Sequence, residues 1–155
     1  MVTGYDGADE SLSTPETAMV DPRAPRFGQA LTATGLLGGV LFDLPLAVFA
    51  IATILVVAVA SQWRLDLYGV LFKNVVHPLL DPRPPESATP HRFAKVVGAV
   101  GTTIASGLLL AGFTLAGYLV AVPIIVAAGL GATTGFCLGC HMYRQVSLFR
   151  RLSIV

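Results

Sequence analysis

The sequence predicts an all-α integral membrane protein with four transmembrane helices arranged as two helical hairpins. Of the 155 residues, 54% are hydrophobic and only 12% are charged, whereas soluble domains carry about 25% charged residues. The mean hydropathy is +0.73. The charges lie in segments that alternate with long uncharged runs, and each run needs about 20 apolar residues to cross a bilayer as a helix.

The charge balance and the cysteine content exclude two other classes of protein. Ten Lys and Arg against nine Asp and Glu give a net charge of +1, which is not the charge of a nucleic-acid-binding protein. Two cysteines are too few for a disulfide-dense secreted scaffold. The partner that the composition predicts is therefore the lipid bilayer, with no nucleic acid.

The N-terminal segment, residues 1–20, is predicted to be a disordered acidic tail. It contains Asp6, Asp9, Glu10 and Glu16 and no Lys or Arg, so it cannot bury enough apolar surface to fold alone. A secretory signal begins with a positively charged region, which this acidic segment lacks. We therefore expect the first hydrophobic segment to stay in the mature protein.

The membrane domain is predicted to span residues 21–145, and its first hairpin comprises spans at 27–42 and 44–62. The two uncharged runs are separated by Asp43, a good N-cap residue, and Pro45 is tolerated in the first turn of the second helix.

The second hairpin is predicted to have spans at 94–112 and 117–139. Residues 96–143 carry no formal charge apart from a fraction on His141, and this stretch is long enough for two helices. The glycines within 112–117 favour a break there.

Residues 64–93 are predicted to be an interfacial and linker segment. Aromatic residues alternate there with charged ones and are followed by the proline-rich stretch DPRPPESATP, which is typical of a short interfacial helix and an extended linker. Alternatively, residues 65–77 extend the second helix into water. The pairs Arg26-Phe27 and Arg92-Phe93 lie 66 residues apart and suggest that the two hairpins are a parallel internal repeat. The sequence leaves open whether this repeat is real.

The basic residues predict the orientation in the cytoplasmic membrane. They precede the first span, lie between the hairpins or follow the fourth span, and neither hairpin turn contains one. By the positive-inside rule, both termini are cytoplasmic. Residues 146–155 form a basic amphipathic tail in which Phe149, Arg150 and Arg151 are suited to anionic head groups.

Cys137 and Cys140 are the candidate functional residues. On a helix, this spacing places both sulfurs on one face, where they could cycle between dithiol and disulfide. A thiolate needs a positive field, and the end of the fourth span offers no helix N-terminus. His141, Arg144 or a restart of the helix at Gly139 would have to supply that field.

The cysteine pair also admits other chemistry, although no cofactor is predicted. Cys137, Cys140 and His141 could contribute to a soft-metal site. The string CLGCH matches the haem c attachment pattern, but the predicted orientation places it inside the cell, which disfavours haem c.

Gly131, Gly135 and Gly139 form a stripe of small residues that predicts close helix packing. The partner helix lies within the bundle, across a homo-oligomer or in another membrane protein. The last case corresponds to a non-catalytic structural subunit of a membrane assembly.

The chain resembles a small membrane protein family known as domain of unknown function 4395. The residues that carry the resemblance are DPRAPRF, a central YGVLF with a nearby HPLL, a second Arg-Phe pair and the terminal FCLGCHMY, over residues 20 to 145. The resemblance implies a multi-span membrane architecture and singles out Cys137, Cys140 and Tyr143, but it implies no reaction. In the family's signature the residue after the second cysteine is not fixed as His, which further disfavours haem c.

The function predicted from the sequence is a thiol-disulfide or sulfur-handling role at the cytoplasmic face, with a cytoplasmic thiol partner. Soft-metal binding and a structural role in a membrane assembly are the alternatives. Beyond the cysteine pair, the sequence contains no recognisable catalytic constellation, so whether the protein is an enzyme is left open.

Overall fold

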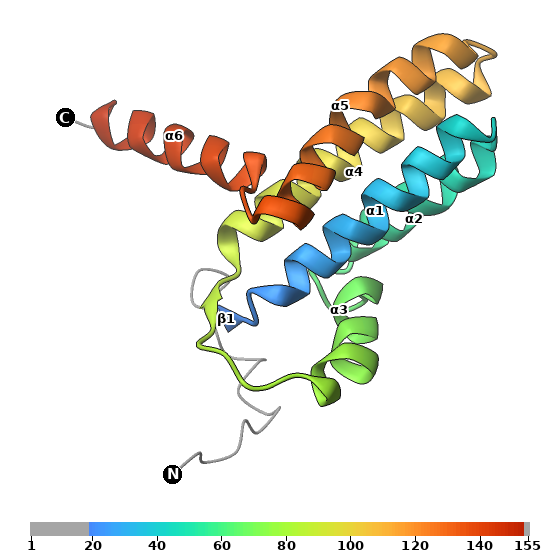
Figure 1. The fold of residues 1–155 in the computed structure, drawn as a ribbon. Coiled ribbons are helices and arrows are strands. Elements are labelled where there is room, and N and C mark those ends of the chain that lie inside the picture. The colour runs from blue at the N-terminus through green and yellow to red at the C-terminus, as the bar shows by residue number, and fades with distance from the viewer. Residues whose placement is uncertain (1–18, 154–155) are drawn as a thin grey trace.

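The computed structural model describes residues 19–153, and this part of the chain is helical apart from one short β-ribbon (Figure 1). The predicted disordered tail lies outside the described residues except for Met19–Val20, which form strand β1. The long helices are α1 (Arg23–Leu41), α2 (Pro45–Ala60), α4 (Thr89–Leu110) and α5 (Thr114–Thr134). The prediction of an all-helical protein is confirmed.

The four long helices form two hairpins, α1–α2 and α4–α5, which lie side by side with both turns at the same end (Figure 1). Helix α1 packs on α2 and α5, and α4 packs on α5 and α2. Exchanging one hairpin for the other leaves this pattern of packing unchanged. It is the arrangement that a parallel repeat about an axis along the bundle would produce.

The core runs between the hairpins and combines branched side chains with small ones. Its buried residues include Leu36, Val48, Ile51, Leu55, Ala99, Ala105 and Ala121. The alanines let α4 and α5 approach their neighbours closely, which is the usual way that helices pack in a membrane.

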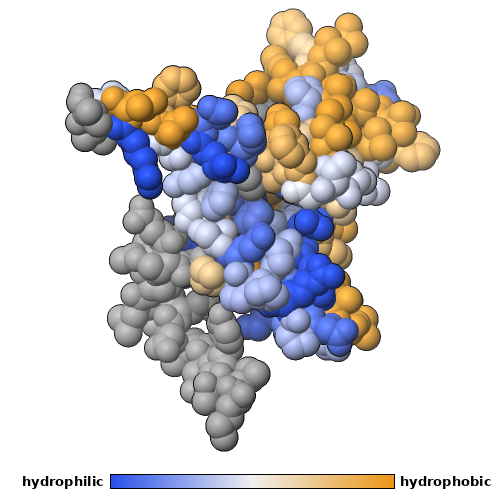
Figure 2. All heavy atoms as spheres, turned by 60° about the vertical axis from the view of Figure 1, so that its left-hand side comes forward, coloured by the Kyte–Doolittle hydropathy of each residue, from blue (hydrophilic) through white to orange (hydrophobic). Residues whose placement is uncertain are grey.

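The outer surface of the hairpin end is apolar. Figure 2 shows hydrophobic residues over that end and hydrophilic ones over much of the rest of this face. The exposed side chains there include Leu41, Phe42, Leu46, Leu110, Phe113 and Leu115. Two described helices, α4 and α5, are long and apolar enough to cross a membrane, while the apolar helix α2 has 16 residues.

The hairpin turns differ in detail from the sequence prediction. Pro45 lies at the start of α2 as predicted, but Leu44 and not Asp43 occupies the N-cap position. Asp43 instead adopts a left-handed conformation with φ of 50°. In the second turn Gly112 has φ of 86°, and this reversal lets α5 begin at Thr114, three residues before the predicted start.

The segment between the hairpins folds back beside α1 instead of extending α2. Gln62 and Trp63 have φ of 52° and 72°, so the chain leaves the helical path after Ala60. A short helix, α3 (Leu67–Leu71), follows and continues through a π-turn at Phe72–Val76 and a 3-10 turn at His77–Leu79. This geometry rules out the alternative in which residues 65–77 prolong the second helix.

A two-stranded ribbon that the sequence did not predict joins the linker to the segment before α1. Strand β1 (Met19–Val20) pairs with β2 (Glu86–Ser87) in antiparallel register. Arg23 supports the same junction, since its Nη1 donates to the carbonyl oxygen of Asp81 at 3.1 Å. A strand of two residues is too short to show the alternating hydrophobic pattern from which strands are predicted.

The fourth predicted span, 117–139, is wrong at its C-terminal end because α5 stops at Thr134. A separate helix, α6 (Leu138–Leu152), begins four residues later and projects away from the bundle (Figure 1). The boundary expected between 145 and 146 therefore falls inside a continuous helix.

Candidate functional site

The cysteine pair lies at the start of α6 and not at the end of α5. The backbone N–H of His141 donates to the carbonyl oxygen of Cys137 at 3.0 Å, the first hydrogen bond of the new helix. Cys137 is thus the N-cap residue of α6. The helix N-terminus that the sequence analysis found missing is present.

Gly135 causes the break that creates this N-terminus. It has φ of 72° and caps the C-terminus of α5 in the left-handed conformation, which glycine adopts without steric cost. The guanidinium of Arg26, from the start of α1, occupies the space that a side chain at Gly135 would need. A cation at this place also complements the negative end of the α5 dipole.

Gln29 of α1 connects the break to the thiol. Its Nε2 donates to Sγ of Cys137 at 3.4 Å. The same side chain lies where a Cβ on Gly131 would sit, so the lack of a side chain at Gly131 makes room for it. The contact joins residues 108 positions apart in the sequence.

The three glycines of the predicted stripe contact two helices of the same chain. Gly131 and Gly135 face Gln29 and Arg26 of α1, whereas Gly139 faces Ala94 of α4. Because α5 ends between Gly131 and Gly135, the three do not lie on one helical face.

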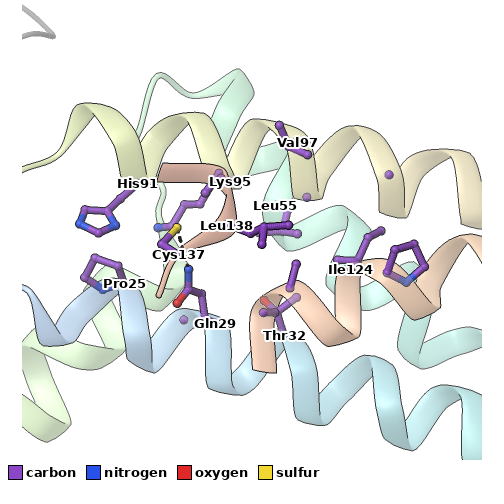
Figure 3. A pocket seen from close by; sticks show the side chains of 18 of the residues that line it. Pro25, Gln29, Thr32, Leu55, His91, Lys95, Val97, Ile124, Cys137 and Leu138 are labelled. Atoms are coloured by element: carbon purple, nitrogen blue, oxygen red, sulfur yellow. Dashed lines mark hydrogen bonds between the residues drawn. The ribbon is translucent and has the colours of Figure 1, made fainter. Parts of the chain in front are cut away.

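Cys137 lies in the wall of a partly enclosed cavity of about 390 Å³ between α1, α4, α5 and the start of α6. This volume lies within the range of roughly 300–1,000 Å³ that is typical of small-molecule sites. Figure 3 shows Gln29, His91, Lys95 and Cys137 gathered at one end, with Ile124 at the other. The cavity is therefore most polar at one end and mainly apolar along the rest of its length.

An ion pair supports the polar end. Lys95 of α4 contacts Oδ2 of Asp66, and these two side chains are only 20% and 21% exposed. Oδ1 of Asp66 is buried and has no hydrogen-bond partner in the described structure. Asp66 immediately precedes α3, so the pair fixes the linker segment to α4.

Tyr68 of α3 and Thr32 of α1 form a second polar contact in the cavity wall. The Thr32 hydroxyl donates to the Tyr68 hydroxyl at 3.3 Å, and the Tyr68 ring packs against Gly28. Burial raises the pKa of the Tyr68 phenol above its ordinary value, the Thr32 hydrogen bond lowers it in part, and the charge of Asp66 raises it further.

The other predicted site residues extend along α6. The His141 ring lies 5.4 Å from the Phe136 ring, and the Tyr143 ring lies 5.7 Å from that of Phe93. Arg144 is exposed. The side chain of Cys140 lies outside the described part of the structure. Among the described residues, no group of three or more His, Cys, Asp or Glu is placed to hold a metal ion.

Sequence reasoning missed the hydrogen-bond partner of the thiol, Gln29, and the ion pair at the polar end of the cavity. Gln29, Asp66 and Lys95 come from three separate segments, and no spacing rule relates them. The one local signal in the sequence was the amide side chain of Gln29, which lies inside an otherwise apolar run in the first predicted span.

The chain matches the family described as "Domain of unknown function (DUF4395)" over residues 20–147. The chain belongs to this family. The resemblance seen in the sequence is thereby confirmed. No curated protein and no solved structure matches the chain.

The DUF4395 region contains the complete cavity wall, since the lining residues run from Pro25 to Met142. It ends at residue 147, within α6. The thiol, its hydrogen-bond partner Gln29 and the Lys95–Asp66 pair therefore all belong to the family's domain.

Proposed function

We propose that this DUF4395 chain is a four-span protein of the cytoplasmic membrane that handles thiols or sulfur at the cytoplasmic face through Cys137 and Cys140. The observation that carries the proposal is the position of Cys137. Its thiol lies at the N-terminus of α6, accepts a hydrogen bond from Gln29 and lines a cavity.

The packing of the helices and the charges support the four-span architecture and its orientation. Helices α1 and α2 pack beside α4 and α5 as a second hairpin, and α2 carries no charge. The basic residues lie away from the two hairpin turns: Arg23, Arg26, Arg64, Lys73, Arg83, Arg92, Lys95, Arg144, Arg150 and Arg151. The positive-inside rule assigns that end of the bundle to the cytoplasm.

The surroundings of Cys137 favour the thiolate, the form that attacks disulfides. The N-terminus of α6 presents the positive end of a helix dipole. The amide of Gln29 adds a hydrogen-bond donor, and Lys95 adds a positive charge that Asp66 partly neutralises.

The proposed reaction is a thiol-disulfide exchange with a cytoplasmic partner. The Cys137 thiol loses its proton, and the resulting thiolate attacks a partner disulfide. This step forms a mixed disulfide and releases one partner thiolate, which takes up a proton. Cys140 then loses its proton and attacks Sγ of Cys137, releasing the second partner thiolate, which also takes up a proton. Two electrons and two protons pass from the cysteine pair to the partner, and the reverse reaction restores the dithiol.

The two alternatives have weaker support. The soft-metal site has weaker support because His141, one of its three candidate ligands, packs its ring beside Phe136. For the structural subunit, the glycine contacts are made within the chain and so do not require a second protein.

The thiol proposal is tested by maleimide labelling in intact cells, with peptide mass spectrometry to quantify each cysteine. We expect a membrane-permeant maleimide to label Cys137 and Cys140 and an impermeant one to label neither. Prior reduction should increase labelling of both residues together. Labelling by the impermeant reagent would contradict the orientation, and labelling that is insensitive to reduction in cells exposed to oxidant would contradict the redox role.

A matched pair of variants tests the environment of Cys137. In a Cys140→Ser background, Gln29→Leu should slow alkylation of Cys137 at neutral pH because a donor to the thiolate is lost. Gln145→Leu, which changes an exposed glutamine on α6, should leave the rate unchanged. Equal rates in the two variants would show that Gln29 does not activate the thiol. Stoichiometric zinc or copper that disappears with Cys137→Ser would favour the metal alternative.

A further inference from the structure

The cavity has features that the thiol chemistry does not require. A cysteine that reacts with a cytoplasmic protein needs only an accessible sulfur, whereas Cys137, which is half-buried, lies in the wall of a cavity that continues along the bundle to Val120 and Ile124 of α5. The walls of this extension come mainly from α2, α4 and α5 and consist largely of apolar side chains and glycines, with the hydrogen-bonded hydroxyls of Thr32 and Tyr68 as polar groups.

The polar end is rich in hydrogen-bond donors. The Lys95 ammonium has three N–H groups, and the carboxylate of Asp66 approaches it from one side. The Gln29 amide has two N–H groups, one of which is directed at Cys137. Among the described residues that line the cavity, none is acidic. A group that offers oxygen acceptors is thus the best match for this end.

The remaining length of the cavity is suited to an apolar chain. Leu55 of α2, Val97 of α4 and Ile124 of α5 contribute side chains to it. Gly98 and Gly101 line it on α4, with Ile124 packed against Gly101. A Cβ added at Gly98 would lie 3.5 Å from the nearest atom of Leu55, which is an ordinary van der Waals distance. Apolar ligand atoms gain free energy there by leaving water.

The direction of this polarity matches that of a lipid in the membrane. The donors lie toward the end of the bundle where α1 and α4 begin with Arg23, Arg26 and Arg92, and the apolar part lies toward the hairpin turns (Figures 1 and 3). A molecule in the cavity would have its head and tail at the same levels as those of a lipid in the adjacent leaflet.

We propose that the cavity between α1, α4 and α5 binds a single-chain amphiphile, with an oxygen-acceptor head beside Gln29 and Lys95 and an apolar chain along Gly98, Gly101 and Ile124. A carboxylate and a neutral carbonyl share this head chemistry. The inference concerns binding alone, so it holds or fails independently of the redox state of Cys137.

The test uses photo-crosslinking of the full chain, purified in detergent micelles, with palmitic acid that carries a diazirine in its chain. We expect cross-links on the segments around Gly98–Gly101 and Val120–Ile124, located by peptide mass spectrometry. Unlabelled palmitic acid should remove them, and hexadecane, which lacks a head group, should not. Equal competition by hexadecane would overturn the assignment of the head site. Competition by 2-heptadecanone would show that a neutral carbonyl suffices, and its failure would show that a carboxylate is required.

Two glycine substitutions on one helix provide the matched control. Gly98→Leu fills the cavity and should abolish these cross-links, whereas Gly107→Leu points into open space and should leave them at the wild-type level. Gly98→Ala, which adds only a Cβ at an ordinary distance, checks that position 98 tolerates substitution and should retain the cross-links. If Gly98→Leu does not fold, Gln29→Glu replaces a donor with a negative charge and should weaken competition by palmitic acid. Cross-links that persist in folded Gly98→Leu protein, or competition unchanged in Gln29→Glu protein, would overturn the proposal.

Discussion

Tyr118 of α5 donates a hydrogen bond of 2.7 Å to Oδ1 of Asp43 in the turn between α1 and α2. The contact joins the two hairpins near their turns, away from the polar end of the cavity. Asp43 can reach Tyr118 because its left-handed backbone places it in the turn and not at the start of α2. The acidic residue that the sequence suggested as a helix cap therefore serves to connect the hairpins.

Tyr118→Phe should destabilise the bundle modestly. The substitution removes one hydrogen bond and keeps the ring, and a bond of this kind contributes about 0.5–1.5 kcal/mol to the free energy of unfolding. We expect the lower part of that range because Asp43 is exposed. Unfolding by sodium dodecyl sulfate in mixed micelles measures the change. Asp43→Asn keeps an acceptor oxygen and should cost less, and a Tyr118→Phe protein as stable as wild type would contradict the prediction.

Gly135→Ala should be more damaging than the same change in open parts of the bundle. An L-residue in the left-handed conformation costs about 1–2 kcal/mol, and the new methyl group would also displace the Arg26 guanidinium. Gly107→Ala, where nothing lies within 4 Å, is the control and should be neutral or slightly stabilising. Because the backbone conformation persists, Arg26→Ala should rescue Gly135→Ala only in part. Full rescue would assign the whole cost to the steric clash.

Lys95→Met should destabilise the protein because it leaves the Asp66 carboxylate without its cationic partner. Breaking a fully buried pair costs about 3–5 kcal/mol, and since about one fifth of each side chain is exposed, we expect about 2 kcal/mol here. The double variant Lys95→Met/Asp66→Leu removes both charges and should recover most of this loss. The free energies of unfolding of the single and double variants provide the comparison, and additive losses would contradict the pairing.

Tyr68 should make the stability sensitive to alkaline pH. The folded protein holds the phenol pKa above its ordinary value, so the neutral form is favoured in the folded state. The associated stability is complete below the unfolded pKa of about 10 and is lost as the pH rises through the folded pKa. Unfolding free energies measured from neutral to strongly alkaline pH should therefore decline more steeply in wild type than in Tyr68→Phe.

The sequence predicted the four long helices well because long apolar runs and single turn residues carry strong signals. Pro45 and Gly112 lie at the hairpin turns, where the physical rules for proline and glycine place them. The end of α5 was missed because Gly135 has two opposite uses. In a membrane helix, a glycine favours close packing and continuity, whereas in the left-handed conformation it ends the helix. In the folded chain Gly135 has the second use, with φ of 72° and the Arg26 guanidinium packed beside it.

The candidate site could be predicted only to the level of the cysteines. Cys137 was singled out by its spacing from Cys140, a local property of the chain. Its hydrogen bond to Gln29 depends on how α1 packs against α5, and the ion pair of Lys95 depends on how the linker folds back beside α1. Contacts of this kind are set by tertiary packing, which no local pattern in one sequence records.

The left-handed glycine at the end of α5 also sets where the Cys137 sulfur lies along the bundle. A helix that continued from Thr134 would rise by about 1.5 Å per residue and would carry the second cysteine roughly 9 Å farther from the bundle. By turning the chain aside at Gly135, the protein keeps Cys137 level with the first turns of α1 and α4. In the proposed four-span orientation, a thiol at that level would lie at the boundary between the bilayer and the cytoplasm, within reach of reactants from either phase.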